Sequence, residues 1–520
     1  MRSRHRPVLL IFHALVVSLL CGVGWTPRVR AADGAPIWTN RFNSGGSDVA
    51  RAMAVDKSGN VFVTGDFASG NAFGHTNSFA TVAYSAGGVP FWTNVFIGPN
   101  FNDLPHAIAV DNSGNVFVTG ESQRFGFGPN YATVAYSGAG VPLWTNHYYG
   151  AGSWGSARAL AVNDTGNLFV AGDGYATIAY SGGGVLLWTN RYIGSIKSND
   201  VAYAMVAGRN GNIFVTGWSM GSGGDYDFAT LAYSDAGVPL WTNRYNGPGH
   251  SNDLAGTIAM DGKGNVFVAG YSLGSGGNYD FTTLAYSDAG VPLWTNRFDG
   301  PNGSNDYPVA IAVDANGNVF VAGDSMGSGG DFDFATLAYS NTGVPLWTNY
   351  YNGTGNSNDY ADSITVDANG NVFVIGTSMA NSTGNVYVTI AYSGAGVPLW
   401  TNRYGDGGSN SYQSVAVKVD GNGNVVVTGS GGVFSDYVTI KYSAITPSPP
   451  LLKQFEMENG FFRFLFSAAA YRSYAVDFTE FLISSNWTTL TNIGVQPIAT
   501  NIAVVNAITN NARFYRVRTP

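Results

Sequence analysis

The tripeptide Trp-Thr-Asn occurs eight times in this chain of 520 residues, and its regular return constrains the fold more than any other feature. The spacings between successive tryptophans are 54, 52, 44, 53, 53, 53 and 53 residues. Self-similarity at such a period is typical of repeat architectures, in which each repeat is one supersecondary unit. The tryptophans are Trp38, Trp92, Trp144, Trp188, Trp241, Trp294, Trp347 and Trp400.

Each repeat contains three further apolar segments, so the repeat unit has four short strands. A Gly-Asn-Val-Phe-Val type of segment begins at Gly59, and an Ala-Thr-Val-Ala-Tyr type ends at Tyr84; both have eight copies. A shorter apolar stretch, such as residues 107–111, precedes each Gly-Asn segment. Only four of the 33 acidic residues are glutamate and 70 residues are glycine, which favours strands and tight turns over helices. Four-stranded units repeated radially predict an all-β protein, a β-propeller with eight blades.

The order of the segments predicts how the ring closes. The first strand, residues 36–42, has the outermost type, whereas the last copy ends after its third strand at Tyr442. We expect residues 36–42 to pair beside 438–442, which would close the ring and remove a bare sheet edge. The propeller would then span residues 32–445. One tryptophan per blade at a fixed place predicts packing between blades rather than platforms for carbohydrate stacking.

The repeat resembles a known family. The pattern Asp-x-x-Gly-Asn-Val-Phe-Val-Thr-Gly, then Tyr-Ala-Thr-Val-Ala-Tyr-Ser and Leu-Trp-Thr-Asn-Arg-Tyr-Asn-Gly, is similar to the bacterial SBBP family of β-propeller repeats. The resemblance covers roughly residues 35–443. It implies a secreted or cell-surface location and no defined activity, and the family is named for seven blades where this chain has eight copies.

The N-terminal segment predicts export. Three arginines in the first six residues precede an apolar run at 8–23, and Val29-Arg30-Ala31 forms a small-x-small pattern typical of a signal-peptidase site. An apolar run of this length is short for a membrane span. Cleavage after Ala31 would remove the only cysteine and change the net charge from −8 to −13, since five arginines and no acidic residue precede that point. A mature protein that acidic argues against nucleic acid as a partner.

Beyond a proline-rich linker at residues 446–452 the repeat ends, and residues 453–520 predict a small β-sandwich-like module. Its Tyr-x-Val strand, a later Trp487 and a closing Arg-Phe-Tyr-Arg-Val-Arg are similar to a short module at the C-termini of exported planctomycete and verrucomicrobial proteins. Sorting, surface attachment and a simple folded cap are all compatible with this module. No apolar segment that could anchor the chain in a membrane follows it.

Aspartates recur at two loop positions, one eight residues before the end of the inner strand in six of the eight repeats and one between the second and third strands in four. Both loops would open on the same face of a propeller, where ligand sites are often found. Aspartates in Gly/Asn-rich loops offer the oxygen ligands that calcium prefers. The alternative is that each aspartate caps its own turn. The candidate calcium ligands are Asp227, Asp253, Asp280, Asp306, Asp333 and Asp359.

Other chemistry is weakly indicated. The histidines at 75, 106, 147 and 250 lie in different repeats without paired spacing, so a zinc site is not expected. The Gly-rich stretch 221–224 lacks a following helix and lysine, which excludes a typical phosphate loop. Lys418 and Lys441 replace small residues in the last repeat and either have functional chemistry or extend toward solvent from a looser blade.

Two functions are compatible with these patterns. The first is a secreted or cell-surface binding or scaffold protein, not an enzyme, that uses the loop-rich face to bind protein or polysaccharide at the cell envelope. The second is a quinone-dependent (PQQ-type) periplasmic dehydrogenase, because such enzymes have eight blades and Gly-x-x-x-Trp motifs like 237–241. We expect a monomer that needs no cofactor apart from the possible calcium.

Overall fold

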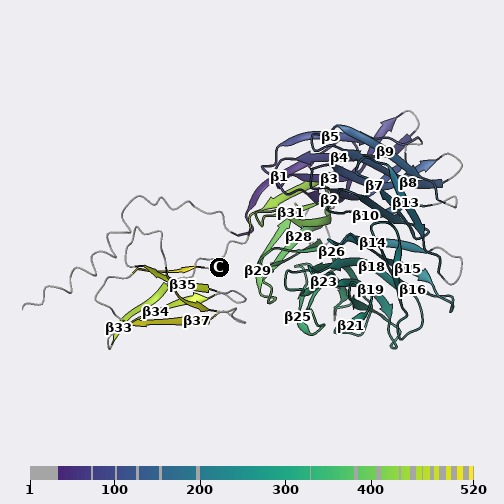
Figure 1. The fold of residues 1–520 in the computed structure, drawn as a ribbon. Coiled ribbons are helices and arrows are strands. Elements are labelled where there is room, and N and C mark those ends of the chain that lie inside the picture. Colours follow the sequence, from purple (N-terminus) through teal and green to yellow (C-terminus); the bar gives the residue numbers. More distant parts are fainter. Residues whose placement is uncertain are drawn as a thin grey trace, which may run out of the picture.

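The computed structural model describes residues 33–444 apart from short loop segments (72–73, 100–101, 125–127, 151–154, 195–199, 328, 380–383, 406–411 and 433–434), and six strands between 452 and 518. The predicted signal segment 1–31, most of the predicted linker and Trp487 lie outside these residues. Eight four-stranded antiparallel sheets form the blades of a β-propeller, and two three-stranded sheets follow (Figure 1).

The inner strands of neighbouring blades lie side by side around the axis. They carry small residues at alternate positions, which suits the most crowded part of the ring. The inner strands are β2 (Asp48–Val55), β6 (Asp103–Val110), β10 (Ala157–Val162), β14 (Val201–Ala207), β18 (Asp253–Met260), β22 (Asp306–Val313), β26 (Asp359–Val366) and β30 (Tyr412–Val419).

The second and third strands form the buried centre of each blade, and most of their residues are inaccessible to solvent. The second strands are β3 (Val61–Asn71), β7 (Val116–Arg124), β11 (Leu168–Gly172), β15 (Ile213–Met220), β19 (Val266–Leu273), β23 (Val319–Met326), β27 (Val372–Met379) and β31 (Val425–Gly431). The third strands are β4 (Gly74–Tyr84), β8 (Gly128–Tyr136), β12 (Ala176–Tyr180), β16 (Tyr226–Tyr233), β20 (Tyr279–Tyr286), β24 (Phe332–Tyr339), β28 (Asn385–Tyr392) and β32 (Asp436–Tyr442).

The outer strands begin with proline in seven of the eight blades. Proline has no N–H to offer at a sheet edge, so it protects these exposed edges from pairing with another chain. The outer strands are β1 (Pro36–Phe42), β5 (Pro90–Phe96), β9 (Pro142–Tyr148), β13 (Leu186–Arg191), β17 (Pro239–Tyr245), β21 (Pro292–Phe298), β25 (Pro345–Tyr351) and β29 (Pro398–Tyr404).

The N-terminal strand completes the last blade, as the segment order predicted. β1 pairs antiparallel with β32, with Thr39 opposite Ile440. The inner strands β2 and β30 of the first and last blades are neighbours. A hydrophobic cluster that includes Val61 and Val63 of the first blade also contains Val426 of the last.

The Trp-Thr-Asn motif joins each blade to the next. In seven blades the indole N–H donates to a backbone carbonyl in the turn between the third and outer strands of the following blade; Trp241 donates to Asp288 at 2.8 Å. The asparagine side chain of all eight motifs donates to a glycine carbonyl of the same kind, as Asn243 does to Gly290 at 2.7 Å. A side chain on Gly290 would meet the Trp241 ring at 2.6 Å, so the turn requires glycine both for this contact and for its positive φ.

The C-terminal strands form two sheets, β33-β34-β37 and β36-β35-β38. Buried Phe464, Val476 and Val504 pack together and so join the two sheets. These strands are β33 (Leu452–Glu458), β34 (Phe461–Ala468), β35 (Tyr474–Thr479), β36 (Thr488–Ile493), β37 (Thr500–Ala507) and β38 (Phe514–Arg518). Within the part of the chain that the structure describes, no helix has the length and apolar character needed to cross a membrane.

Candidate functional site

The two faces of the propeller differ in how closely they follow the repeat. One face carries the turns between inner and second strands and between third and outer strands, which are short and nearly identical in every blade. The opposite face carries the connections between second and third strands and from each outer strand to the next inner strand. We call this second face the long-loop face. Its loops vary in length and sequence, as functional loops on rigid scaffolds commonly do.

The aspartates that open the inner strands cap their own turns. Asp306 is buried, and its carboxylate accepts the backbone N–H of Gly300 at 2.6 Å. Asp253 and Asp359 accept the equivalent N–H of the glycine six residues earlier. Burial raises the pKa of all three carboxyl groups, and the capping hydrogen bonds oppose this effect. Three of the six candidate calcium ligands therefore have a structural partner already.

Two of the other candidates form ion pairs with the outer strand of their own blade. Asp227 contacts Arg244 at 2.7 Å, and Asp280 contacts Arg297 at 2.6 Å. Each guanidinium also donates to a second-strand carbonyl, in the case of Arg297 that of Ser272 at 3.0 Å. The arginine thus fastens the loop to the edge of the blade.

The sixth candidate, Asp333, lacks such a partner. Tyr350 stands on the outer strand where the two preceding blades have arginine, and no ion pair involves Asp333 among the residues that the structure describes. Burial, together with repulsion from Asp359 and Asp331, raises the pKa of Asp333 to about 6.

Carboxylates come close enough to share a cation at one place. One oxygen each of Asp280, Asp299 and Asp306 lies within 4.8 Å of the others, and within the described ranges this is the only group of three or more such ligands. Asp299 was not predicted, because it follows the outer strand in this blade alone. A calcium ion here would compete with Arg297 for Asp280 and with the Gly300 N–H for Asp306.

A β-bulge near the long-loop end of every inner strand creates a second ring of candidates. The pairing with the second strand skips one inner-strand residue, and such bulges redirect a side chain. The second-strand glycine opposite the bulge is required, since a side chain on Gly270 would lie 2.1 Å from the Leu254 carbonyl oxygen. The skipped residues are Arg51, His106, Arg158, Tyr203, Gly256, Val309, Asp362 and Val415.

The residue after that glycine varies just as widely from blade to blade. We call the two sets together the bulge ring. Sequence reasoning missed it, although the signal was present: these two positions hold charged, aromatic and small residues in different repeats, whereas the glycine before the second position occurs in all eight. The second set is Asp66, Glu121, Asp173, Trp218, Tyr271, Asp324, Thr377 and Ser430.

In the first three blades the bulge ring is charged. Arg51 pairs with Asp66, and Arg158 pairs with Asp173 at 2.6 Å. Burial lowers the pKa of His106, an effect that the nearby carboxylates oppose. The charges on this side are therefore largely paired within their own blades.

In the sixth and seventh blades the bulge ring holds two carboxyl groups. Asp324 accepts the backbone N–H of Ala361 at 2.7 Å, and Asp362 accepts hydrogen bonds from Thr377 and Ser414. Burial raises the pKa of Asp324 to about 8, with a contribution from Asp362, and raises that of Asp362 to about 6. Asp324 therefore changes charge near neutral pH.

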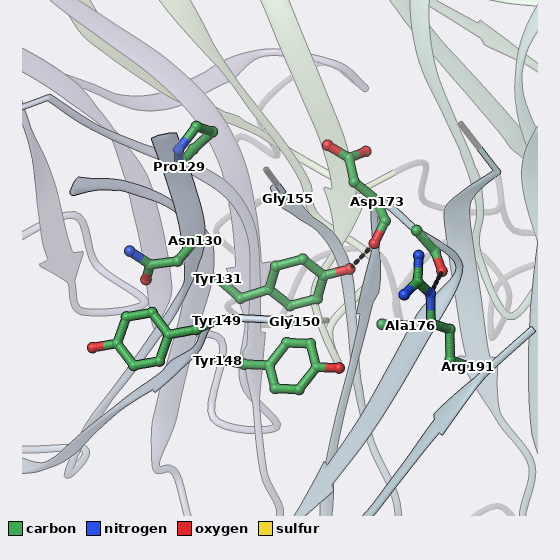
Figure 2. A pocket seen from close by; sticks show the side chains of 11 residues that line it. Pro129, Asn130, Tyr131, Tyr148, Tyr149, Gly150, Gly155, Asp173, Ala176 and Arg191 are labelled. Carbon is green, nitrogen blue, oxygen red and sulfur yellow. Dashed lines mark hydrogen bonds between the residues drawn. The ribbon is translucent and has the colours of Figure 1, made fainter. Parts of the chain in front are cut away.

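The short third repeat opens a small cleft beside the second blade. Its second and third strands are joined by a tight turn at 173–175, which accounts for the short spacing of 44 residues seen in the sequence. Figure 2 shows Tyr131, Tyr148, Tyr149 and Arg191 around the cleft, with the Tyr131 hydroxyl donating to the Asp173 carbonyl at 2.8 Å. The cavity measures about 50 Å³, enough for a few water molecules.

The described histidines do not form a site. His147 contacts Asn130 at 3.0 Å, His106 belongs to the bulge ring and His250 lies in a turn with φ 44°. The side chain of His75 lies outside the described residues.

The two unusual lysines have different surroundings. Lys441 is buried, and its Nζ lies 2.7 Å from Asp420 and donates to the Ala86 carbonyl of the first blade at 3.0 Å. Lys418 occupies the inner-strand position of Ala54 and remains accessible to water. The desolvation it experiences inside the ring lowers its pKa.

The Gly-x-x-x-Trp spacing of residues 237–241 serves the contact between blades. A side chain on Gly237 would meet the Trp188 ring of the preceding blade at 2.6 Å, and Trp241 reaches the following blade. These residues are thus engaged in packing on the face opposite the long loops.

No family model matches the chain, so the resemblance to the SBBP repeat stays a prediction. No curated protein sequence matches it either. Among solved structures, Sqt1 of Chaetomium thermophilum is similar with a TM-score of 0.50 and 10% identity, over 79% of this chain and 98% of that one. The C-terminal WD40 domain of Sif2 (TM-score 0.48, 11% identity, 78% of this chain and 99% of that one) and a fungal alcohol oxidase in complex with copper (0.40, 13%, 92% and 94%) are also similar. At 10% identity the likeness to Sqt1 concerns the fold alone. The eight four-stranded blades are those of this chain's own sheets.

Proposed function

We propose that this chain is an exported binding or scaffold protein, located outside the cell or on its surface, in which a closed propeller ring presents the long-loop face to a partner. The observation that carries the proposal is the contrast between the two faces. Positions that are constant in all blades serve the repeat itself, as nearest-neighbour contacts in repeat proteins do. The bulge ring changes from blade to blade, even where Asp324 and Asp362 form hydrogen bonds with the following blade, so its residues can be selected for binding.

The quinone-dependent dehydrogenase finds no support in this geometry. Its sequence argument rested on Gly-x-x-x-Trp motifs, and those residues join neighbouring blades. The bulge ring holds an ion pair in the first and third blades and aromatic side chains in the fourth and fifth, which suits recognition of a partner.

The proposal is tested by measuring binding of the purified protein to a panel of envelope proteins and polysaccharides. Asp299→Lys reverses an exposed charge on the long-loop face, and Asp164→Lys makes the same change in an exposed turn of the opposite face. We expect the first change to weaken binding and the second to leave it unaltered. Binding that depends only on Asp164, or no binding to any member of the panel, would refute the proposal.

A further inference from the structure

Five aromatic side chains form a continuous arc across the fifth, sixth and seventh blades on the long-loop face. Tyr271 lies 5.2 Å from Tyr279 and 5.1 Å from Tyr307, measured between ring centroids. Phe332 follows at 6.0 Å from Tyr307, and Tyr360 at 5.9 Å from Phe332. None of the five is buried, and 38% of Tyr360 is exposed. We call these residues the aromatic arc.

The frame of the propeller does not require the aromatic arc. Tyr307 and Tyr360 occupy the second position of their inner strands, and Tyr271 belongs to the bulge ring. Other blades form the same strands with aliphatic or polar residues at that inner-strand position, namely Val49, Leu104, Leu254 and Gln413. Contiguous, partly exposed aromatic groups that the fold does not need are typical of binding surfaces.

Carboxyl groups flank one end of the aromatic arc. Burial, together with the nearby carboxyl groups of Asp324 and Asp331, raises the pKa of Tyr360, and Asp362 lies near Asp324. Within the described part of the chain, Asp324, Asp331 and Asp362 take part in no ion pair. Aromatic faces attract cations, and carboxylates form their strongest hydrogen bonds with guanidinium and ammonium groups. The surface is thus complementary to organic cations, and a bound cation would favour the ionised form of Asp324, whose pKa burial raises to about 8.

The spacing of the rings indicates how the cations are presented. The steps from Tyr307 to Phe332 and from Phe332 to Tyr360 are 6.0 and 5.9 Å. In an extended peptide, side chains on one face recur at about 6.6 Å, twice the rise per residue. We infer that the aromatic arc binds an extended segment of a partner protein in which lysine or arginine occupies alternate positions. The inference rests on the proposed binding function and names the partner's chemistry.

The test uses a fluorescently labelled peptide of alternating arginine and serine, with an isomer in which the three arginines are consecutive. Binding is measured by anisotropy at low and at physiological salt. We expect the alternating peptide to bind more tightly than its isomer. Tyr307→Ala should weaken binding by about twofold to thirtyfold, the range for loss of one cation–π contact. Tyr360→Phe keeps the ring and should bind nearly as well as the wild type.

Tyr149→Ala is the matched control, because Tyr149 is an exposed tyrosine of the same face in the second blade. Thermal melting verifies that each variant is folded. No binding of either peptide, or equal weakening by Tyr149→Ala and Tyr307→Ala, would overturn the inference. Binding of a neutral hexasaccharide that is lost in Tyr307→Ala, without peptide binding, would also overturn it but would leave the proposed function standing. Only failure of the whole panel of envelope components removes the proposed function itself.

Discussion

Replacing Lys441 by methionine should destabilise the junction between the last and first blades. The Lys441 ammonium is 2.7 Å from Asp420, and the two side chains are 3% and 0% exposed. Its second hydrogen bond, to the Ala86 carbonyl, reaches the first blade. Removing one partner of a buried ion pair typically costs about 3–5 kcal/mol, because the other charge stays buried. Asp420 keeps donors within its own turn, from the backbone N–H groups of Asn422 and Asn424, so we expect the lower end, about 3 kcal/mol.

The free energy of unfolding is measured by urea denaturation followed by both tryptophan fluorescence and circular dichroism. Arg41→Met is the control, since Arg41 is 39% exposed and lies 3.6 Å from Asp436, and an exposed pair contributes about 0–1 kcal/mol. The double change Lys441→Met with Asp420→Asn removes both charges and should be more stable than Lys441→Met alone. A loss below about 1 kcal/mol for Lys441→Met, or no recovery in the double variant, would refute this account.

The pH dependence of this pair has a defined sign. Burial alone would raise the pKa of Asp420, but the hydrogen bonds from Lys441 and Asn424 outweigh it and lower the pKa. The pair therefore stabilises the fold above the pKa of an unfolded aspartate, about 3.9, and this stabilisation is lost as the pH falls through the lower folded value.

Three further predictions concern other parts of the ring. The pKa of Asp324 is about 8 in the folded protein, so the folded state binds this proton more tightly than the unfolded state does. The melting temperature should therefore fall as the pH rises from 5 to 8.5, and Asp324→Asn should flatten this dependence. Removing residues 32–42 exposes the edge of β32 and should lower the melting temperature or cause aggregation, whereas an unchanged melt would mean that β1 is dispensable. If calcium binds the acidic loops, it should raise the melting temperature of the wild type but not of Asp253→Asn with Asp306→Asn; no shift in the wild type would leave those carboxylates as turn caps alone.

The architecture could be predicted from the sequence because every level of it repeats. Strand number, blade number and the pairing of residues 36–42 with 438–442 follow from the order of segments, and the structure shows eight four-stranded sheets with β1 beside β32. The hydrogen bonds of Asn243 and its equivalents could not be foreseen in the same way. Their acceptors lie in the next blade, and only the geometry of neighbouring blades places the two together.

The candidate site was harder to predict, because a repeat search finds the positions that are the same in every blade, whereas specific binding depends on positions that differ between blades. The repeated aspartates were the pattern that the sequence showed. In the structure Asp306 caps its turn and Asp280 forms an ion pair. The aromatic arc combines three kinds of position from three blades, such as the start of a third strand at Tyr279 and the second inner-strand position at Tyr307. No single sequence motif contains them, since bulges and loops bring them together.

The turns of one face are nearly identical and the loops of the other vary, and this difference follows from where the stabilising contacts lie. The asparagine hydrogen bond of every blade, and the tryptophan hydrogen bond of seven, end in a turn of the face opposite the long loops, such as the turn that contains Gly290. A substitution there would disturb two blades at once, which explains why these turns stay nearly identical. On the long-loop face a residue such as Tyr203 contacts Trp218 of its own blade and is 42% exposed, so its replacement disturbs little of the frame. Sequence change can therefore accumulate at exposed bulge-ring positions such as Tyr203 at low cost in stability, and this is the surface on which a repeated fold can acquire a specific partner.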